Sequence, residues 1–229
     1  MMELRLIKKV DHFEDVSSFV FEPLEKTSWI AGQYIEMTIG HRDADSRGIK
    51  RIFSISSAPF EDNIVITTRF DFENGSSFKK ALRSLKEKDS VLSSRPKGDF
   101  LIHGNEKSVL FIAAGIGITP FRSIILDLVH KKSSISLEMI YSSRKNKVLF
   151  KDELDRIFDS RDDFKIFYTY SPQRIDEEMI VRNSRFFDEA TVFVSGPAKM
   201  VKDITEECQN LGKDKNDIKR DYFIGYQIT

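Results

Sequence analysis

Cysteine is almost absent from this sequence of 229 residues, because Cys208 is the only one. A single thiol excludes an internal disulfide, and it excludes any iron–sulfur cluster or zinc site built from several thiolates of the chain. The four histidines, His12, His41, His103 and His130, show no metal-ligand spacing. We therefore expect no metal site.

Net charge and long apolar runs are lacking as well. Lysine plus arginine and aspartate plus glutamate number 36 each, which disfavours binding to nucleic acid or to an anionic membrane surface. The longest apolar run, residues 109–118, is interrupted by glycine and is too short to cross a bilayer, and no signal peptide is recognisable. These absences predict a soluble, cytoplasmic protein that does not insert into membranes, and they give no indication of its oligomeric state.

Residues 1–102 consist mainly of short alternating runs. The runs are LRLIKKV, VSSFVFEP, QYIEMTI, RIFSIS, NIVITTRF and DSVLSSRP, separated by turn residues. Strands at this spacing predict an antiparallel barrel or sandwich. One stretch, SSFKKALRSL at residues 76–85, repeats its apolar residues at helical spacing, so we expect a short helix inserted into the β domain.

Residues 103–229 alternate strand patterns with helix patterns. The buried-strand runs VLFIAAG, SLEMIYSS, FKIFYTYS and ATVFVSGP are each followed by a helical segment. This alternation predicts a Rossmann-like α/β domain with a parallel five-stranded sheet and helices on both faces. The length suits two domains, and we expect them at residues 1–102 and 103–229.

The segment AAGIGITPFRS connects the first of these buried strands to its helix. Gly115 and Gly117 would let the backbone approach a bulky ligand, and the amides that open the helix would face that ligand. Pro120 suits a first helical turn, but it stands where the three-glycine dinucleotide fingerprint has its last glycine, which disfavours a conventional dehydrogenase. The alternative is a tight strand-to-helix turn that needs its glycines for packing.

A second buried strand leaves the sheet through Ser195, Gly196 and Pro197. Ligands of open parallel sheets bind outside the carboxyl ends of the strands, so two such exits predict one shared site. Ordinary Gly-Pro turn chemistry is the alternative.

The stretch RIFSISSAP concentrates polar side chains on a short predicted strand. Alternation places Arg51 and Phe53 on one face of this strand and Ser54 and Ser56 on the other. The combination suits a ligand with an anionic tail and a flat polar ring. An edge strand that ends at its proline is the simpler alternative.

The order of these motifs, RIFSISS, then GIGITP, then VSGP, resembles that of the ferredoxin–NADP reductase family of flavoproteins over nearly the whole chain. The resemblance implies a Greek-key, FAD-binding antiparallel barrel followed by an NAD(P)-binding domain. It also implies a reaction in which hydride passes from NADPH or NADH to FAD and electrons then leave singly to an acceptor.

For the flavin, the resemblance implies contacts from the RIFSISS strand and from the helix inserted into the barrel. Arg51 would pair with the pyrophosphate, Phe53 would lie against the flavin in place of the family's tyrosine, and Ser54 would face the flavin N5 as a catalytic group. Helix capping by serine and sheet packing by threonine are the structural alternatives for part of this set. The remaining implied flavin contacts are Ile52, Ser57, Thr67, Thr68, Gly75, Ser76, Ser77 and Phe78.

For the nicotinamide nucleotide, Gly115, Gly117, Thr119 and Pro120 match the family's glycine loop, and Thr119 would orient the ring as a catalytic group. The stretch Ser195, Gly196, Pro197 matches one that usually reads Cys-Gly-Pro, so Ser195 would take the catalytic position of the thiol.

The adenosine end of the cofactor and the chain terminus carry the last implied contacts. Ser143 and Arg144 stand where relatives select the adenosine end, and the cations there favour NADPH over NADH, although solvated surface charge is the alternative. Near the end of the chain, Phe223 and Tyr226 are the candidates for a ring that approaches the flavin face; packing of the terminal strand is the alternative for both.

The electron acceptor is expected to be a separate molecule, because we see no room for a globin or iron–sulfur module. A ferredoxin, a flavodoxin, an oxygenase component or free flavin would fit. Two other functions stay open: a flavin-binding electron-transfer or regulatory subunit of a larger complex, and a nucleotide-binding module without flavin.

Overall fold

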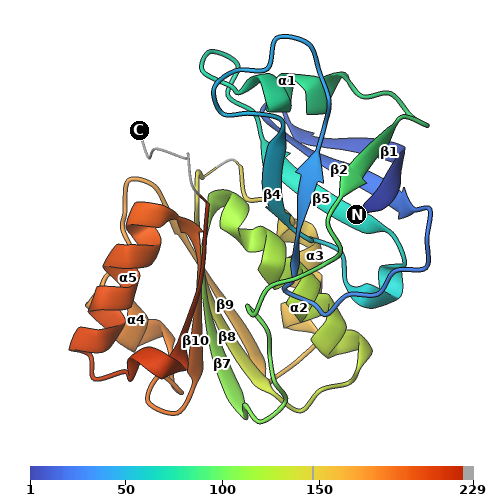
Figure 1. The fold of residues 1–229 in the computed structure, drawn as a ribbon. Coiled ribbons are helices and arrows are strands. Elements are labelled where there is room, and N and C mark those ends of the chain that lie inside the picture. Colours follow the sequence, from blue (N-terminus) through green and yellow to red (C-terminus); the bar gives the residue numbers. More distant parts are fainter. Residues whose placement is uncertain (146, 224–229) are drawn as a thin grey trace. The chain divides into compact units, whose positions relative to one another are not determined.

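The computed structural model describes residues 1–145 and 147–223 (Figure 1). The chain divides into two compact units: residues 1–101 with residues 122–127, and residues 102–121 with the chain from residue 128 onward. Among the described residues, no helix has both the length and the apolar character that crossing a membrane requires.

The first unit is built on one six-stranded antiparallel sheet in the order β4-β3-β6-β1-β2-β5. Its end strands meet, because Ile55 pairs with Ile66 and the Ser56 amide donates to Val65 O over 2.8 Å. The sheet therefore closes into the predicted antiparallel barrel. The strands are β1 (Met2–Phe13), β2 (Val16–Pro23), β3 (Tyr34–Thr38), β4 (Lys50–Ser54), β5 (Ile64–Arg69) and β6 (Ser90–Ser93).

The side chains that fill the barrel interior come from alternate positions of its strands. Alternate residues in part of β2 and of β5 are large apolar side chains of the core, namely Phe19 and Phe21 on one strand and Ile64 and Ile66 on the other. The predicted inserted helix is confirmed as α1 (Ser77–Ser84), whose buried side chains join the same core. Its position therefore follows from the packing of one apolar face.

The second unit is a five-stranded parallel sheet in the order β11-β10-β7-β8-β9, as predicted. Apolar residues of α4 and α5 share a core cluster with β7 and β10 and so cover one face of the sheet, while Phe121 of α2 packs on Phe111 of β7 in a separate ring contact. Residues 122–127 of α2 belong to the first unit. The elements from residue 102 onward are β7 (Ser108–Ala114), α2 (Ile118–His130), β8 (Ser136–Ser143), α3 (Lys151–Asp159), β9 (Phe164–Tyr170), α4 (Glu177–Asn183), β10 (Thr191–Pro197), α5 (Ala198–Asn210) and β11 (Ile218–Phe223) (Figure 1).

Candidate functional site

The two predicted strand exits of the second unit lie against each other. A 3-10 turn, Gly115–Gly117, leads from β7 into α2, and Gly115 has a φ of +54° that favours glycine. A Cβ on Gly117 would stand 2.3 Å from the Ser195 carbonyl oxygen, so the backbone at the end of β10 passes directly over this glycine. Only glycine fits at residue 117.

This contact marks the point where the strand order reverses. The chain proceeds from β7 to β8 on one side, and β10 pairs with β7 on the other side. Such a switch point at the carboxyl ends of parallel strands is where open α/β sheets bind their ligands. The geometry therefore brings both predicted loops to one place, as the sequence analysis expects.

Ser195 holds a polar atom that no group of the described residues satisfies. Its side chain is fully buried, and its Oγ has no hydrogen-bond partner among the described residues. Thr119 is also buried, but its Oγ1 donates to Ile116 O over 3.0 Å and ties the glycine turn together. Of these two predicted catalytic groups, Ser195 keeps its hydroxyl proton uncommitted, whereas Thr119 has only acceptor capacity left.

Other predicted residues of this unit occupy varied positions. Gly196 packs so closely on the strand that an added Cβ would lie 3.2 Å from Ala114 Cβ, and Pro120 stands in the first turn of α2, as predicted. Ser143 is buried at the end of β8 and donates to Lys147 O over 2.8 Å, whereas Arg144 is exposed. Ser143 thus shapes the turn that presents Arg144.

The terminal aromatic candidates are only partly described. Phe223 is the last residue of β11 and pairs in register with Pro197. Tyr226 lies outside the described residues.

In the barrel, Arg51 and Phe53 lie on one face of β4, as the alternation predicts. The Arg51 guanidinium lies 5.4 Å from the centroid of the Phe78 ring, and the Phe53 ring lies 5.9 Å from the same ring. Phe53 belongs to the barrel core and is 7% exposed. Ile52 faces the opposite way and is largely exposed.

The Arg51 guanidinium is partly satisfied by its own chain. Its Nη1 donates to Arg47 O over 2.7 Å and to Gly48 O over 3.3 Å, whereas its buried Nη2 has no partner among the described residues. Burial lowers the pKa of Arg51, as expected for a cation that has lost water. An unsatisfied, desolvated guanidinium nitrogen favours binding of an anionic group.

A series of hydrogen bonds leads from His12 of β1 through hydroxyl groups of β2 and β5 to Ser56, which follows β4. Ser56 Oγ donates to Val65 O over 3.0 Å, so its contact with Thr67 Oγ1 at 3.0 Å must be one in which Thr67 donates. Thr67 then accepts from Ser18 Oγ, and Ser18 accepts from His12 Nε2, each at 2.7 Å. The Thr67 proton is committed, so its side chain can only accept a hydrogen bond from a ligand.

The neighbouring predicted residues are buried. Ser54 and Thr68 are 5% and 2% exposed, and Ser57 is fully buried. The Ser57 hydroxyl oxygen accepts from the Val65 amide over 3.0 Å, and the Ser57 carbonyl oxygen accepts from Trp29 Nε1 over 3.1 Å. Ser57 therefore helps to close the barrel.

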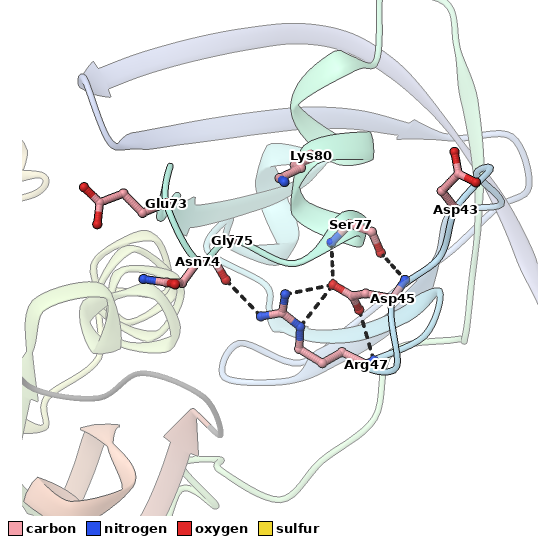
Figure 2. Close-up of a pocket in the computed structure, with 8 residues that line it drawn as sticks. All are labelled: Asp43, Asp45, Arg47, Glu73, Asn74, Gly75, Ser77 and Lys80. Atoms are coloured by element: carbon pink, nitrogen blue, oxygen red, sulfur yellow. Dashed lines mark hydrogen bonds and ion pairs between the residues drawn. The ribbon is translucent and has the colours of Figure 1, made fainter.

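The predicted phosphate cradle at the start of α1 is already bonded to an acidic side chain. Ser76 caps the helix, because its Oγ accepts from the Lys79 amide over 3.3 Å. The Ser77 amide donates to Asp45 Oδ2 and the Asp45 amide donates to Ser77 Oγ, over 2.8 and 2.9 Å (Figure 2). Gly75 is fixed for a packing reason, since an added Cβ would stand 2.2 Å from Asp71 O.

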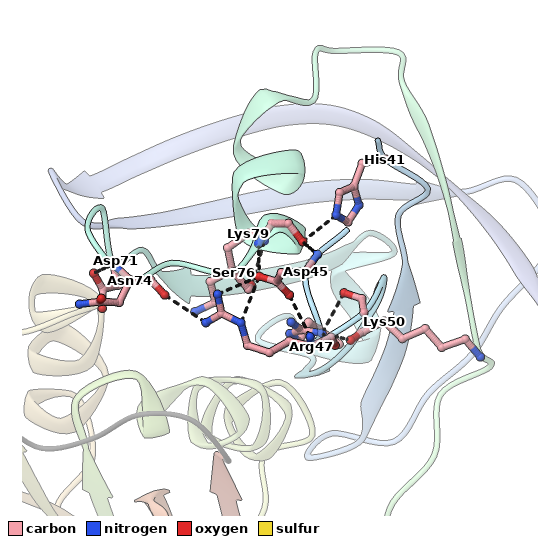
Figure 3. A network of polar contacts seen from close by, with 11 residues as sticks. His41, Asp45, Arg47, Lys50, Asp71, Asn74, Ser76 and Lys79 are labelled. Carbon is pink, nitrogen blue, oxygen red and sulfur yellow. Dashed lines mark hydrogen bonds and ion pairs between the residues drawn. The ribbon is translucent and has the colours of Figure 1, made fainter. Parts of the chain in front are cut away.

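Asp45 is held in turn by Arg47. The Arg47 Nη2 and Nε atoms lie 2.8 and 3.1 Å from Asp45 Oδ2, and Nη1 donates to Asn74 O over 3.0 Å (Figure 3). The hydrogen bonds from Arg47 and from the Ser77 amide lower the pKa of Asp45 to about 2, so it is a carboxylate at neutral pH.

A pocket of about 560 Å³ opens at these groups. Its lining combines three carboxylates with two cations and the start of α1: Asp43, Asp45, Glu73, Arg47, Lys80, Asn74, Gly75 and Ser77 (Figure 2). The sequence analysis missed Asp45 and Arg47. No local pattern identifies their contacts with α1 and its preceding turn, because Ser77 and Asn74 follow about thirty residues later in the chain.

The residues present fit the two expected cofactors. On the barrel, the unsatisfied Arg51 Nη2 is suited to a pyrophosphate, and the start of α1 is of a kind that binds phosphate, although its Ser77 amide is bonded to Asp45. On the parallel sheet, the close approach of Gly117 to Ser195 and the unsatisfied Ser195 hydroxyl suit a flat polar ring such as a nicotinamide.

Comparison with known proteins gives a match to one domain family and several proteins that are similar to nearly the whole of this chain. Residues 111–206 match the family model of the oxidoreductase NAD-binding domain. The flavohemoprotein of Oceanobacillus iheyensis is 25% identical over 239 aligned residues, which cover 96% of this chain and 58% of that protein. The chain thus spans about half the length of the curated relatives that it matches.

Two solved structures share the fold over nearly their whole length. The FAD/NAD-binding domain of nitric oxide dioxygenase from Vibrio cholerae has a TM-score of 0.81 at 20% identity, covering 97% of this chain and 98% of that one. The ferredoxin–NADP+ reductase of Plasmodium falciparum has a TM-score of 0.80 at 14% identity, covering 96% and 95%. The chain therefore has the fold of these two structures, and its residues 111–206 match an oxidoreductase NAD-binding domain.

Proposed function

We propose that this module oxidises NADPH or NADH with a bound FAD and passes the electrons singly to a separate acceptor. The observation that supports this most is the combination of the matched NAD-binding domain with a barrel whose Arg51 keeps a buried, unsatisfied nitrogen. The names of the similar proteins agree with it, since they describe flavohemoproteins and FAD/NAD-binding domains.

The barrel residues would bind and orient the flavin. Arg51 and the amides that open α1 would hold the pyrophosphate, which fixes the register of the ligand along the barrel. Ser54 would face the flavin N5 and position it. When bound, FAD supplies the redox chemistry, since it accepts a hydride and releases electrons one at a time.

The residues of the parallel sheet would hold the nicotinamide nucleotide. Gly115 and Gly117 allow a close approach of the ligand to the turn, and Ser195 would donate its uncommitted proton to the carboxamide of the ring. Thr119 would fix the shape of the turn through its bond to Ile116 O. The protein's contribution is then distance and orientation rather than covalent chemistry.

The names of the relatives favour a haem protein as the acceptor. Flavohemoproteins match this chain over only part of their own length, and a haem accepts one electron at a time. A ferredoxin, a flavodoxin, an oxygenase component or free flavin are the alternative acceptors.

Identification of the extracted cofactor tests this proposal. We expect a yellow protein that releases FAD on denaturation and reduces ferricyanide with NADPH or NADH. A flavin-containing protein that oxidises neither nucleotide would favour the electron-transfer or regulatory subunit. A protein that binds no flavin would contradict the proposal.

Arg51→Ala should weaken FAD binding roughly tenfold or more, because charge-assisted hydrogen bonds contribute about 1.5–3 kcal/mol.

The nucleotide preference is tested at Arg144. We propose that its exposed guanidinium binds the 2′-phosphate of NADPH. Arg144→Ala should then raise the KM for NADPH and leave the KM for NADH within a factor of two. Equal changes for both nucleotides would contradict a role in selection.

A further inference from the structure

One segment of the first unit contacts the groups expected to bind the flavin pyrophosphate. This segment, residues 41–49, connects β3 to β4 and is called the 41–49 loop below. Its Asp45 bonds the start of α1 (Figure 3). The carbonyls of Arg47 and Gly48 accept from the Arg51 guanidinium. The same short loop thus occupies both halves of the expected anion site.

At the start of α1, Asp45 accepts the hydrogen bonds that a phosphate would accept there. Its carboxylate accepts the Ser77 amide at the start of α1 and is clamped by the forked guanidinium of Arg47. Helix N-termini and arginine forks are the groups that recognise phosphate oxygens. A phosphate that approached the Ser77 amide would meet a carboxylate already bound there, and two anions cannot share that position.

The loop is held by polar contacts and not by apolar packing. None of its side chains belongs to the barrel core, and most of its residues are exposed. Its base is fixed where the Ile39 amide donates to Ile49 O over 3.0 Å, while its other ties to α1 include His41 Nε2 on Ser77 Oγ at 2.9 Å. Segments with few apolar contacts open at low free-energy cost, so the tip of this loop can leave while its base stays.

We propose that the 41–49 loop is a self-occluding element in which Asp45 binds the Ser77 amide in place of a phosphate, so that FAD binds by displacing it. The inference rests on the proposed function and adds a step to it. The loop therefore lowers the affinity of the module for dinucleotide flavin and slows its capture.

The proposal is tested by titrating FAD into flavin-free protein and following the quenching of flavin fluorescence. We expect Asp45→Ala to bind FAD about tenfold more tightly and to capture it faster than the unmodified protein. Asp45→Asn, which keeps an oxygen for the Ser77 amide, should lie between the two and guards against a misfolded alanine variant. Equal or weaker FAD binding by folded Asp45 variants would overturn the proposal.

Two matched controls separate displacement from a general effect of charge. Asp43→Asn removes a carboxylate that lines the same pocket and has no hydrogen bond to α1 among the described residues, and it should change FAD affinity less than twofold. Riboflavin has no phosphate, so its affinity should be the same in all variants. A gain for riboflavin, or an equal gain with Asp43→Asn, would contradict displacement at Ser77. If the unmodified protein and every variant fail to bind flavin, the proposed function itself fails, which is a distinct result.

Discussion

Gly117 and Ser195 are in direct backbone contact, because a Cβ on residue 117 would stand 2.3 Å from the Ser195 carbonyl oxygen and 2.8 Å from Gly196 Cα. These atoms belong to backbone at the end of a central strand and cannot move aside as a flexible side chain would. The contact explains why a turn after β7 and a turn after β10, far apart in the sequence, form one site.

Gly117→Ala should therefore damage both stability and nucleotide binding. Overpacking of this kind costs about 1–3 kcal/mol, and the displaced β10 end would also move Ser195. We expect a lower urea midpoint and at least a tenfold weaker binding of NADPH or NADH. Gly40→Ala is the control, since nothing lies within 4 Å of its added Cβ. A Gly117→Ala protein with unchanged midpoint would contradict the contact.

Glu138 and Arg185 form an ion pair in which only the carboxylate is buried. The Glu138 side chain is 3% exposed and the Arg185 side chain 63% exposed. The carboxylate also accepts Ser184 Oγ and the Arg185 amide, over 2.8 and 2.9 Å. Its loss leaves several buried donors unsatisfied, whereas loss of the guanidinium removes one exposed partner.

Glu138→Leu should accordingly lower the free energy of unfolding by about 3 kcal/mol, while Arg185→Ala should lower it by less than about 1 kcal/mol. Urea denaturation of the two variants measures this asymmetry. Equal losses would mean that the ion pair itself, and not the hydrogen-bonded carboxylate, stabilises this part of the second unit.

Cys208 is a buried residue of α5 and packs in the core of the second unit. This burial, with a smaller contribution from the charge of Glu207, raises the pKa of its thiol to about 12. The thiolate is the reactive form, so the native protein should react with a thiol reagent at pH 8 only after unfolding. The thiol of the unfolded chain loses its proton near pH 9, whereas the thiol of the folded chain keeps it. The free energy of unfolding should therefore fall as the pH rises from about 9 towards 12. Rapid labelling of the native protein would contradict this burial.

The secondary structure and the order of the two sheets could be predicted because they follow from local periodicity. The two-residue alternation of RIFSIS puts Arg51 and Phe53 on one face, and the helical spacing of residues 76–85 gives α1. The meeting of the two glycine turns was also predictable, because strand exits of a parallel sheet share an edge.

The polar chemistry of the barrel site could not be predicted, because it depends on partners distant in sequence. Asp45 bonds Ser77 across 32 positions, and neither residue stands in a pattern that points to the other. The commitment of the Thr67 proton likewise depends on Ser18, 49 positions away. Residue type indicates which hydrogen bonds are available, and only the fold decides which groups remain unsatisfied.

Ser195 gives the sharpest distinction between a structural and a functional role, because its buried hydroxyl has no partner among the described residues. An unsatisfied buried hydroxyl costs free energy, so its removal relieves that cost. Ser195→Ala should leave the urea midpoint unchanged or slightly higher, yet it should slow flavin reduction by NADPH or NADH at saturating nucleotide at least tenfold. Stopped-flow reduction and urea denaturation of the same preparation measure both effects, with Ser195→Cys as the variant that restores a donor. A destabilised Ser195→Ala protein with a normal reduction rate would assign the hydroxyl to the fold and remove it from the nicotinamide site.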